Sequence, residues 1–263
     1  MSEKLVLATA SDGVVRLTLN RPQKRNALTR EVLADFLAQL KGVAARSDVR
    51  CLVLAANGPV FCAGMDLAQM QDTAARPDAA QIWRADTELY HEVVTAVFEL
   101  SVPTLAVVQG PALAGGLGLV LACDLVVAAE TATFSLPEPK RGITAAIVTP
   151  LLVHRAGIAG ASFLLLSGES LDARGAQRMG FCQSVVESAR LSAAADELVR
   201  SILSGAPDAL AATKRQLRAC TPADVSSQSK RAVALSAQAR QTPEAREGLA
   251  AFLEKRPPKW QPK

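Results

Sequence analysis

Residues 112–124 read ALAGGLGLVLACD and link two largely apolar segments, Thr104–Val108 and Asp124–Ala128. Such runs are typical of strands that are covered on both faces. Gly115 and Gly116 open a helix-compatible stretch soon after the first run. The first N–H groups of a helix have no intrahelical acceptor and lie at the positive end of its dipole. We therefore predict that this helix start stabilises negative charge developing on an oxygen atom.

The glycines of this stretch do not form a dinucleotide-binding motif. That motif requires G-x-G-x-x-G, and Leu121 occupies the position of the third glycine. The order of strand, glycine loop and helix has a parallel earlier in the chain, where the apolar run Cys51–Ala56 enters the loop NGPVFCAGMDL, residues 57–67. This repetition predicts an α/β fold of stacked ββα units, whose strands carry loops to a common edge.

The two ends of the chain have different patterns. The alternating segment around the Asp12-Gly13 turn predicts a β-hairpin, and apolar residues at helical spacing after Thr29 predict a capped helix. After about residue 200 the pattern is almost purely helical. We therefore expect a core over residues 1–198 and a helical C-terminal subdomain over residues 199–263, whose Ala-rich faces contact another subunit.

The composition excludes several classes of protein. A hydrophobic share of 49% and a charged share of 21% are typical of a globular chain. The net charge of +4 is mild and comes with a few basic pairs, which favours a small anionic ligand over a nucleic acid. The N-terminus lacks the pattern of a signal or transit peptide, so we expect a cytoplasmic protein. We also expect no apolar segment of membrane-spanning length, and hence no membrane partner.

The cysteines and histidines predict no metal site. The five cysteines are widely spaced, mostly in apolar runs, and are interpreted as buried thiols of a reducing compartment. No two of them have C-x-x-C spacing, and His91 and His154 are too far apart to form a local ligand pair.

Two further segments could carry chemistry. FCAGMDL, residues 61–67, places a glycine just before Met65, where a tight backbone would let a ligand approach the main chain. TFSLPEPKRGI, residues 133–143, presents Glu138 between two prolines, whose rigid flanks would fix a carboxylate as a general base requires. Taken singly, each is better explained as an ordinary turn or a surface glutamate.

Six stretches in order give the chain a specific resemblance over nearly its full length. They are RPQKRNALT (21–29), FCAGMDL (61–67), AGGLGLVLACDL (114–125), FSLPE (134–138), LSGESLDARGAQRMGFCQSVV (166–186) and REGLAAFLEKRPPKW (246–260). Together they resemble the crotonase superfamily, also called the enoyl-CoA hydratase/isomerase family. The resemblance implies a crotonase-like spiral of ββα units, an acyl-CoA thioester substrate, no cofactor beyond the coenzyme A of that substrate, and a homotrimer or a dimer of trimers.

The resemblance also implies roles for individual residues. The N–H groups of Met65 and Gly115 match the oxyanion hole, which would polarise the thioester carbonyl and stabilise the enolate, while Glu138 matches a catalytic glutamate. The positions that match coenzyme A contacts are Lys24, Arg25, Ala27, Ala63, Asp66, Leu67, Ala68, Phe252 and Lys255. We expect Phe252 and Lys255 to reach the nucleotide end of the coenzyme A that is bound by a neighbouring subunit.

Gly118 departs from the family pattern. Typical hydratases of the family carry a second glutamate at its position, so half of an acid-base pair is absent. Hydration can proceed with one carboxylate if the same water supplies both oxygen and proton, and some hydratases that resemble methylglutaconyl-CoA hydratases also carry glycine there. We therefore favour an enoyl-CoA hydratase. The alternatives are an enoyl-CoA isomerase, in which Glu138 alone shifts a double bond, and a non-catalytic acyl-CoA-binding protein.

Four other side chains allow two interpretations each. His91 corresponds roughly to a histidine base of dehalogenase-like members, but a solvent-side helix position is favoured. Trp83 could line the acyl pocket or belong to the core, with no preference between the two. Lys140 and Arg141 could pair with an acidic acyl tail, although we favour solvated side chains for both.

Overall fold

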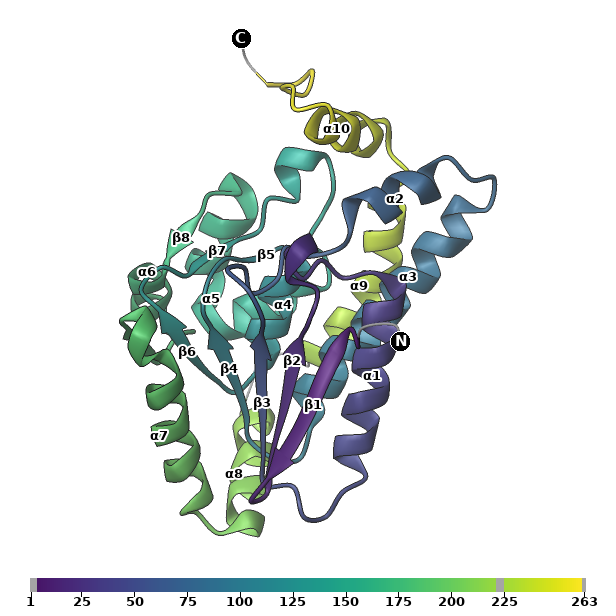
Figure 1. Cartoon of the computed structure of the whole chain (residues 1–263). Helices are drawn as coiled ribbons and strands as arrows, with labels where there is room; N and C mark the ends of the chain where they lie inside the picture. The colour runs from purple at the N-terminus through teal and green to yellow at the C-terminus, as the bar shows by residue number, and fades with distance from the viewer. Residues whose placement is uncertain (1–3, 221–224, 262–263) are drawn as a thin grey trace.

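The computed structural model of the chain describes residues 4–220 and 225–261 (Figure 1). Six strands form the main sheet in the order β1-β2-β3-β4-β6-β9, and three short strands form a second sheet in the order β5-β7-β8. The main-sheet strands are β1 (Val6–Ser11), β2 (Val14–Leu19), β3 (Cys51–Ala56), β4 (Thr104–Val108), β6 (Leu125–Ala129) and β9 (Ser184–Val186). The short strands are β5 (Ala112–Leu113), β7 (Thr133–Ser135) and β8 (Leu171–Asp172).

The main sheet is parallel except at its first strand. β1 and β2 form the expected antiparallel hairpin, and each later strand runs parallel to its neighbour. Asp12 and Gly13 turn the hairpin with φ of 51° and 78°, the positive values that a two-residue hairpin turn requires. Because parallel strands share a direction, the loops that follow β3, β4 and β6 leave from the same edge of the sheet.

The helices surround both sheets. They are α1 (Arg30–Ala44), α2 (Leu67–Ala74), α3 (Ala79–Glu99), α4 (Gly115–Ala122), α5 (Val148–Ser167), α6 (Ala173–Arg178), α7 (Leu191–Leu203), α8 (Pro207–Ala219), α9 (Val225–Ala239) and α10 (Pro243–Leu253). Short 3-10 turns are η1 (Pro22–Lys24), η2 (Pro139–Arg141) and η3 (Ser188–Arg190). The prediction of a helix capped by Thr29 is confirmed, because the Thr29 hydroxyl accepts a hydrogen bond from the Val32 N–H at 3.3 Å.

Apolar packing on both faces of the main sheet explains the continuously apolar strands. Leu52 and Leu54 of β3 belong to the large cluster that α1, α3, α4 and α5 complete. Cys51 and Val53, on the opposite face, pack with α7 instead. Side chains alternate between the two faces along a strand, so both faces must be apolar when both are covered.

Of the C-terminal helices, α10 returns to the edge of the sheet where the loops leave (Figure 1). α7 packs on the face of the main sheet that carries Cys51 and Val53. The expected domain boundary at residue 198 falls inside this helix. α9 lies along α3, and α10 packs on η2 and α2. In Figure 1, α10 therefore sits above the ends toward which the parallel strands point.

Helix α5 differs from the expectation for apolar segments. By length and composition alone, this one of the described helices could cross a membrane, so the expectation that no segment reaches that length is wrong. The helix is interrupted at Gly157, where φ is 67°. Arg155 beside this kink donates a hydrogen bond to the carbonyl oxygen of Asp124 at 2.9 Å, which ties α5 to the end of α4.

Candidate active site

The first loop of the site is held by a buried asparagine. Asn26 is 1% exposed and adopts a φ of 51°, a left-handed conformation that asparagine tolerates better than most residues. Its amide nitrogen donates to the carbonyl oxygens of Asn57 and Val60, both at 2.8 Å, and its side-chain oxygen accepts from the Arg21 N–H at 2.8 Å. These bonds fix the RPQKRNAL segment against the loop that follows β3.

The direction of the Met65 amide follows from its pairing with Leu28. The Leu28 N–H donates to the Gly64 carbonyl at 2.8 Å, and the Asp66 N–H donates to the Leu28 carbonyl at 3.0 Å. Peptide groups alternate in direction along an extended chain, so the N–H of Met65 points away from Leu28. Within the described residues this N–H has no hydrogen-bond acceptor.

The Gly115 amide is presented by a strained residue. Ala114 has φ 52° and ψ −126°, a conformation that is unfavourable for a residue with a Cβ atom and that is found mainly at functional sites. The Ala114 N–H is held by the carbonyl oxygen of Ser135 at 2.9 Å. Gly115 begins α4, so its N–H lacks an intrahelical acceptor and lies at the positive end of the helix dipole.

Gly64 brings these two loops into contact. Its φ is +86°, and a Cβ atom placed on it would lie 2.7 Å from the Ala114 Cβ and 3.2 Å from the Gly115 nitrogen. Only a residue without a side chain fits this approach. The backbone segments that carry the Met65 and Gly115 amides therefore lie close together, and both residues line one pocket.

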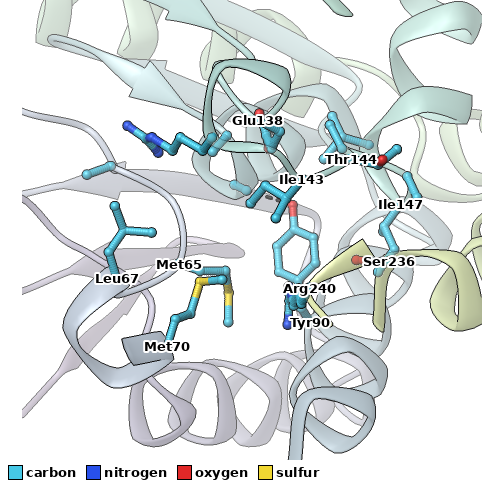
Figure 2. Close-up of a pocket in the computed structure, with 17 residues that line it drawn as sticks. Met65, Leu67, Met70, Tyr90, Glu138, Ile143, Thr144, Ile147, Ser236 and Arg240 are labelled. Carbon is cyan, nitrogen blue, oxygen red and sulfur yellow. Dashed lines mark hydrogen bonds between the residues drawn. The ribbon is translucent and has the colours of Figure 1, made fainter. Parts of the chain in front are cut away.

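Glu138 lines the same pocket and is the one carboxylate among the described residues that line it. It follows β7, begins η2 and is 7% exposed. Its Oε2 atom is buried and has no hydrogen-bond partner among the described residues. Burial raises the pKa of Glu138 to about 7, although the positive charges of Arg141 and Arg240 act in the opposite direction. Figure 2 shows Glu138 above the ring of Tyr90.

Tyr90 fills the position of the missing second glutamate. A Cβ atom on Gly118 would come within 2.0 Å of the Tyr90 hydroxyl and 2.9 Å of a Val148 methyl group. The Tyr90 hydroxyl donates to the Gly115 carbonyl at 2.8 Å, and burial raises the pKa of this phenol well above its usual value. The absence of a carboxylate at Gly118 is thus matched by a neutral phenol that braces the start of α4.

Several residues of this pocket were not predicted from the sequence. Besides Tyr90 they include Met70 of α2, Ile143 and Ile147 after η2, and Ser236 and Arg240 at the end of α9 (Figure 2). Ser236 and Arg240 come from the region assigned to the C-terminal subdomain. No local motif marks them, because α9 reaches the pocket through its packing against the distant helices α3 and α5.

A second groove adjoins the pocket and collects most of the residues matched to coenzyme A contacts. It is lined by Lys24, Arg25, Ala27, Ala63, Asp66, Leu67, Ala68 and Phe252, and it shares Met65 and Arg141 with the pocket. Lys255 is not among the lining residues. Phe252 lines the groove of its own chain, whereas we expected it to serve a neighbouring subunit. The roles of these residues in binding remain predictions.

Asp66 also has a structural role in this groove. Its carboxylate caps α2 by accepting from the Ala68 and Gln69 N–H groups, and it accepts a hydrogen bond from Arg21 at 2.7 Å. Burial alone would raise the pKa of Asp66, but the hydrogen bond from Arg21 and those from the capped helix lower it overall. The loop that carries Met65 is therefore fixed on both sides.

The neighbouring basic residues differ from each other. Lys140 is exposed and pairs with Glu169 at 2.6 Å, as a solvated side chain does. Arg141 is not solvated as expected: it lines the pocket and the groove, and its guanidinium lies 4.3 Å from the centroid of the Phe252 ring. The 3-10 turn η2 separates the two because successive residues point in different directions.

The remaining candidate residues have mixed outcomes. Trp83 is 5% exposed and lines a small cavity that adjoins the pocket, sharing Met70 and Arg240 with it. His91 is half-buried on α3 and does not line the pocket. His154 packs its ring edge-on against Phe98, 6.0 Å between centroids. Four of the five cysteines are buried, and the described residues contain no cluster of His, Cys, Asp or Glu suited to a metal ion.

This geometry suits chemistry at a carbonyl group. Two adjacent N–H groups can donate hydrogen bonds to one carbonyl oxygen and stabilise the negative charge of its enolate. A carboxylate with a pKa near 7 can accept and return a proton at neutral pH. The adjoining groove with Lys24 and Arg25 suits an anionic carrier of the carbonyl compound.

Comparisons with known proteins agree with this description. A family model for enoyl-CoA hydratase/isomerase matches residues 9–263. The 2,3-dehydroadipyl-CoA hydratase of Escherichia coli (strain K12) is 36% identical over 270 residues, with 98% of each chain covered. The 1,2-epoxyphenylacetyl-CoA isomerase of the same organism is 31% identical over 260 residues, again with 98% of each covered.

Solved structures extend the agreement to the fold. The crystal structure of an enoyl-CoA hydratase/isomerase from Xanthobacter autotrophicus Py2 superposes with a TM-score of 0.86 at 32% identity, covering 97% of both chains. The predicted α/β crotonase-like fold with a helical C-terminal region is thereby confirmed. The chain belongs to the enoyl-CoA hydratase/isomerase family of the crotonase superfamily, whose members act on acyl-CoA thioesters.

Proposed function

We propose that this enzyme adds water across the double bond of a 2-enoyl-CoA. The observation that carries the proposal is the buried Oε2 atom of Glu138, which has no partner among the described residues and faces a pocket lined by Met65 and Gly115. An unpartnered buried carboxylate oxygen is costly, and it needs a ligand such as water to satisfy it. The family relationship supplies the substrate class.

One carboxylate is sufficient for the complete addition. The thioester carbonyl accepts hydrogen bonds from the Met65 and Gly115 N–H groups. Glu138 takes a proton from a water molecule as the water oxygen bonds to C3, and the electrons of the double bond move to form an enolate on the thioester oxygen. The protonated Glu138 then returns the proton to C2, and the thioester carbonyl is restored.

The pKa of Glu138 fits this double role. At a pKa of about 7, both protonation states are well populated at neutral pH, so neither the uptake nor the return of the proton is strongly uphill. In the free enzyme the unprotonated form is the one that activates water. We therefore expect kcat/KM for hydration to rise as the pH increases to about 7 and to level off above it.

A double-bond shift is the second candidate function, and Tyr90 is the observation that favours it. Because the phenol closes the space around Gly118, no second carboxylate can help to orient a water molecule there. In an isomerase, Glu138 would remove a proton from C2 of a 3-enoyl-CoA and return it to C4, with the dienolate held by the same two amides. No solvent oxygen enters the product of that reaction.

Two assays on one preparation separate the candidates. Hydration consumes a 2-enoyl-CoA and incorporates ¹⁸O from labelled water, whereas isomerisation converts a 3-enoyl-CoA without incorporating oxygen. Glu138→Gln is expected to lower kcat roughly 10²- to 10⁴-fold in the relevant assay. Binding of acyl-CoA thioesters with no turnover of either substrate would support the non-catalytic alternative and exclude both enzymatic candidates.

We also infer that the chain assembles into trimers or dimers of trimers. The kinked helix α5 leaves large apolar side chains exposed on its outer face, Ile158 at 72%, Phe163 at 46% and Leu166 at 81%. Clustered exposed apolar side chains favour a subunit interface. Light scattering of the purified protein measures the assembly directly, and a monomer at micromolar concentration would contradict the inference.

A further inference from the structure

Two hydrogen-bond donors beside the acyl pocket have no acceptor. The Nη1 atom of Arg240 and the indole Nε1 atom of Trp83 are both buried, and neither forms a hydrogen bond with any described residue. Arg240 lines both the pocket and the small cavity that adjoins it, and Trp83 lines that cavity. Buried donors in proteins are almost always paired, so two orphans around one space indicate a missing acceptor.

The charge balance indicates that this acceptor is an anion. Asp86, a buried acid whose charge acts on Arg240, already forms an ion pair with Arg30, in which Nη2 lies 2.8 Å from Oδ2. Asp86 and Glu138 both lie close enough to interact with Arg240, but no salt bridge to Arg240 forms within the described chain. Burial lowers the pKa of the Arg240 guanidinium. A buried cation without a counter-ion is unfavourable until a negative group joins it.

The position of Arg240 assigns this anion to the acyl end of the substrate. Arg240 lines the pocket together with Glu138, Tyr90 and Ser236, and it does not line the groove that collects the residues matched to coenzyme A. Arg141 lines the groove as well as the pocket and the small cavity, and its guanidinium stacks on Phe252. Figure 2 shows Arg240 at the lower end of the Tyr90 side chain.

The available space limits the length of the acyl group. The pocket measures about 50 Å³ and the adjoining cavity about 20 Å³. Both spaces are therefore small. That suits a short chain with a compact polar end better than a long apolar chain.

We propose that the substrate is a short acyl-CoA whose far end carries a carboxylate, bound by the Arg240 guanidinium and the Trp83 indole N–H. The proposal rests on the proposed function for the reaction, and it adds the chemical class of the acyl group. The carboxylate satisfies both orphan donors and neutralises the buried cation. Arg240 is a specificity-determining residue in this arrangement, and it takes no part in the proton transfers.

Matched saturated ligands test the proposal independently of turnover. Glutaryl-CoA and pentanoyl-CoA have acyl chains of equal length that end in a carboxylate and a methyl group, and adipyl-CoA and hexanoyl-CoA form a longer pair. Calorimetric titration of the full-length enzyme is expected to show at least tenfold tighter binding of the carboxylate ligand in one pair or both. Equal binding within both pairs would overturn the proposal.

Arg240→Met then identifies the residue responsible. We expect it to weaken binding of the carboxylate ligand about 10- to 100-fold and to leave binding of the methyl ligand within threefold. Trp83→Phe keeps an aromatic ring and removes the N–H. We expect it to weaken binding of the carboxylate ligand less than Arg240→Met does, and again to leave binding of the methyl ligand nearly unchanged. Arg84→Met serves as the control, because Arg84 is exposed, is adjacent to Trp83 and pairs with Glu88.

Each of the other outcomes is informative. If Arg240→Met weakens the binding of both ligands equally, Arg240 supports the pocket wall, and the proposal is overturned. A variant that still prefers the carboxylate ligand would also overturn it. Arg240→Lys is expected to recover part of the selectivity if charge is the cause. Selective carboxylate binding by an enzyme that turns over neither 2-enoyl nor 3-enoyl thioesters would reject the proposed reaction and retain the anion site.

Discussion

Gly64→Ala tests the contact on which the oxyanion hole depends. The new Cβ atom would lie 2.7 Å from the Ala114 Cβ and 3.1 Å from the Leu113 carbonyl oxygen. Favourable carbon–carbon contacts are about 3.5–4.0 Å, so the two loops must separate by roughly 1 Å. Ala114 already has an unfavourable conformation, and it cannot retreat without turning the peptide that carries the Gly115 N–H.

The expected losses follow from these two effects. An L-residue at the φ of +86° costs about 1–2 kcal/mol, and overpacking costs about 1–3 kcal/mol more, so we expect the free energy of unfolding to fall by about 2–5 kcal/mol. A displacement of about 1 Å at a catalytic group lowers the rate about 10²-fold, and complete loss of one donor lowers it up to 10³-fold. We therefore expect kcat to fall about 10²- to 10³-fold.

Gly180→Ala is a matched control for the backbone strain. Gly180 has a φ of +89°, but its nearest neighbour to an added Cβ is the Arg155 carbonyl oxygen at 4.0 Å. This variant should lose about 1–2 kcal/mol of stability and keep its kcat. Urea unfolding and steady-state kinetics on a 2-enoyl-CoA and a 3-enoyl-CoA give both quantities. A Gly64→Ala enzyme with a kcat within threefold of Gly180→Ala would refute the reasoning.

Three further predictions concern Glu138, Gly118 and Tyr90. Burial raises the pKa of Glu138 from 4.5 to about 7, so the native state binds more protons in that interval and loses about 3 kcal/mol of stability as the pH rises through it. Glu138→Gln should not show this loss. If the denaturant midpoints of the wild type and of Glu138→Gln change equally between pH 4 and pH 8, the prediction is wrong. Gly118→Glu should fail to raise hydratase activity and should lower the melting temperature, because its Cβ would meet the Tyr90 hydroxyl; a stable, more active variant would disprove the steric argument. Tyr90→Phe removes the hydrogen bond to the Gly115 carbonyl and should cost about 1–2 kcal/mol in unfolding free energy, while an unchanged midpoint would show that the bond contributes nothing.

The sequence predicted the parts of the fold that depend on local pattern. The helix after Thr29 was predicted because its apolar residues repeat at helical spacing behind a capping residue. The strands around residues 51–56 and 104–108 were predicted from their apolar runs. These runs arise because both faces of each strand are buried. Met65, Gly115 and Glu138 were found through six family stretches in order, and the structure brings all three to one pocket.

The residues that the sequence did not predict depend on contacts between distant segments. The departure at Gly118 was visible, but the phenol that fills its place comes from Tyr90, on a different helix. Arg240 has no local motif and reaches the pocket because α9 packs against α3 and α5. Arg141 was expected to be solvated like Lys140, and a single 3-10 turn was enough to send the two side chains in different directions.

The most direct test is a crystal structure of the enzyme with a saturated acyl-CoA bound, in which two distances are measured. We expect the thioester oxygen to lie about 2.7–3.1 Å from the amide nitrogens of both Met65 and Gly115, with the Glu138 carboxylate beside C2 and C3. A thioester oxygen outside hydrogen-bond distance of either amide, or a Glu138 carboxylate turned away from the acyl chain, would contradict the proposed chemistry.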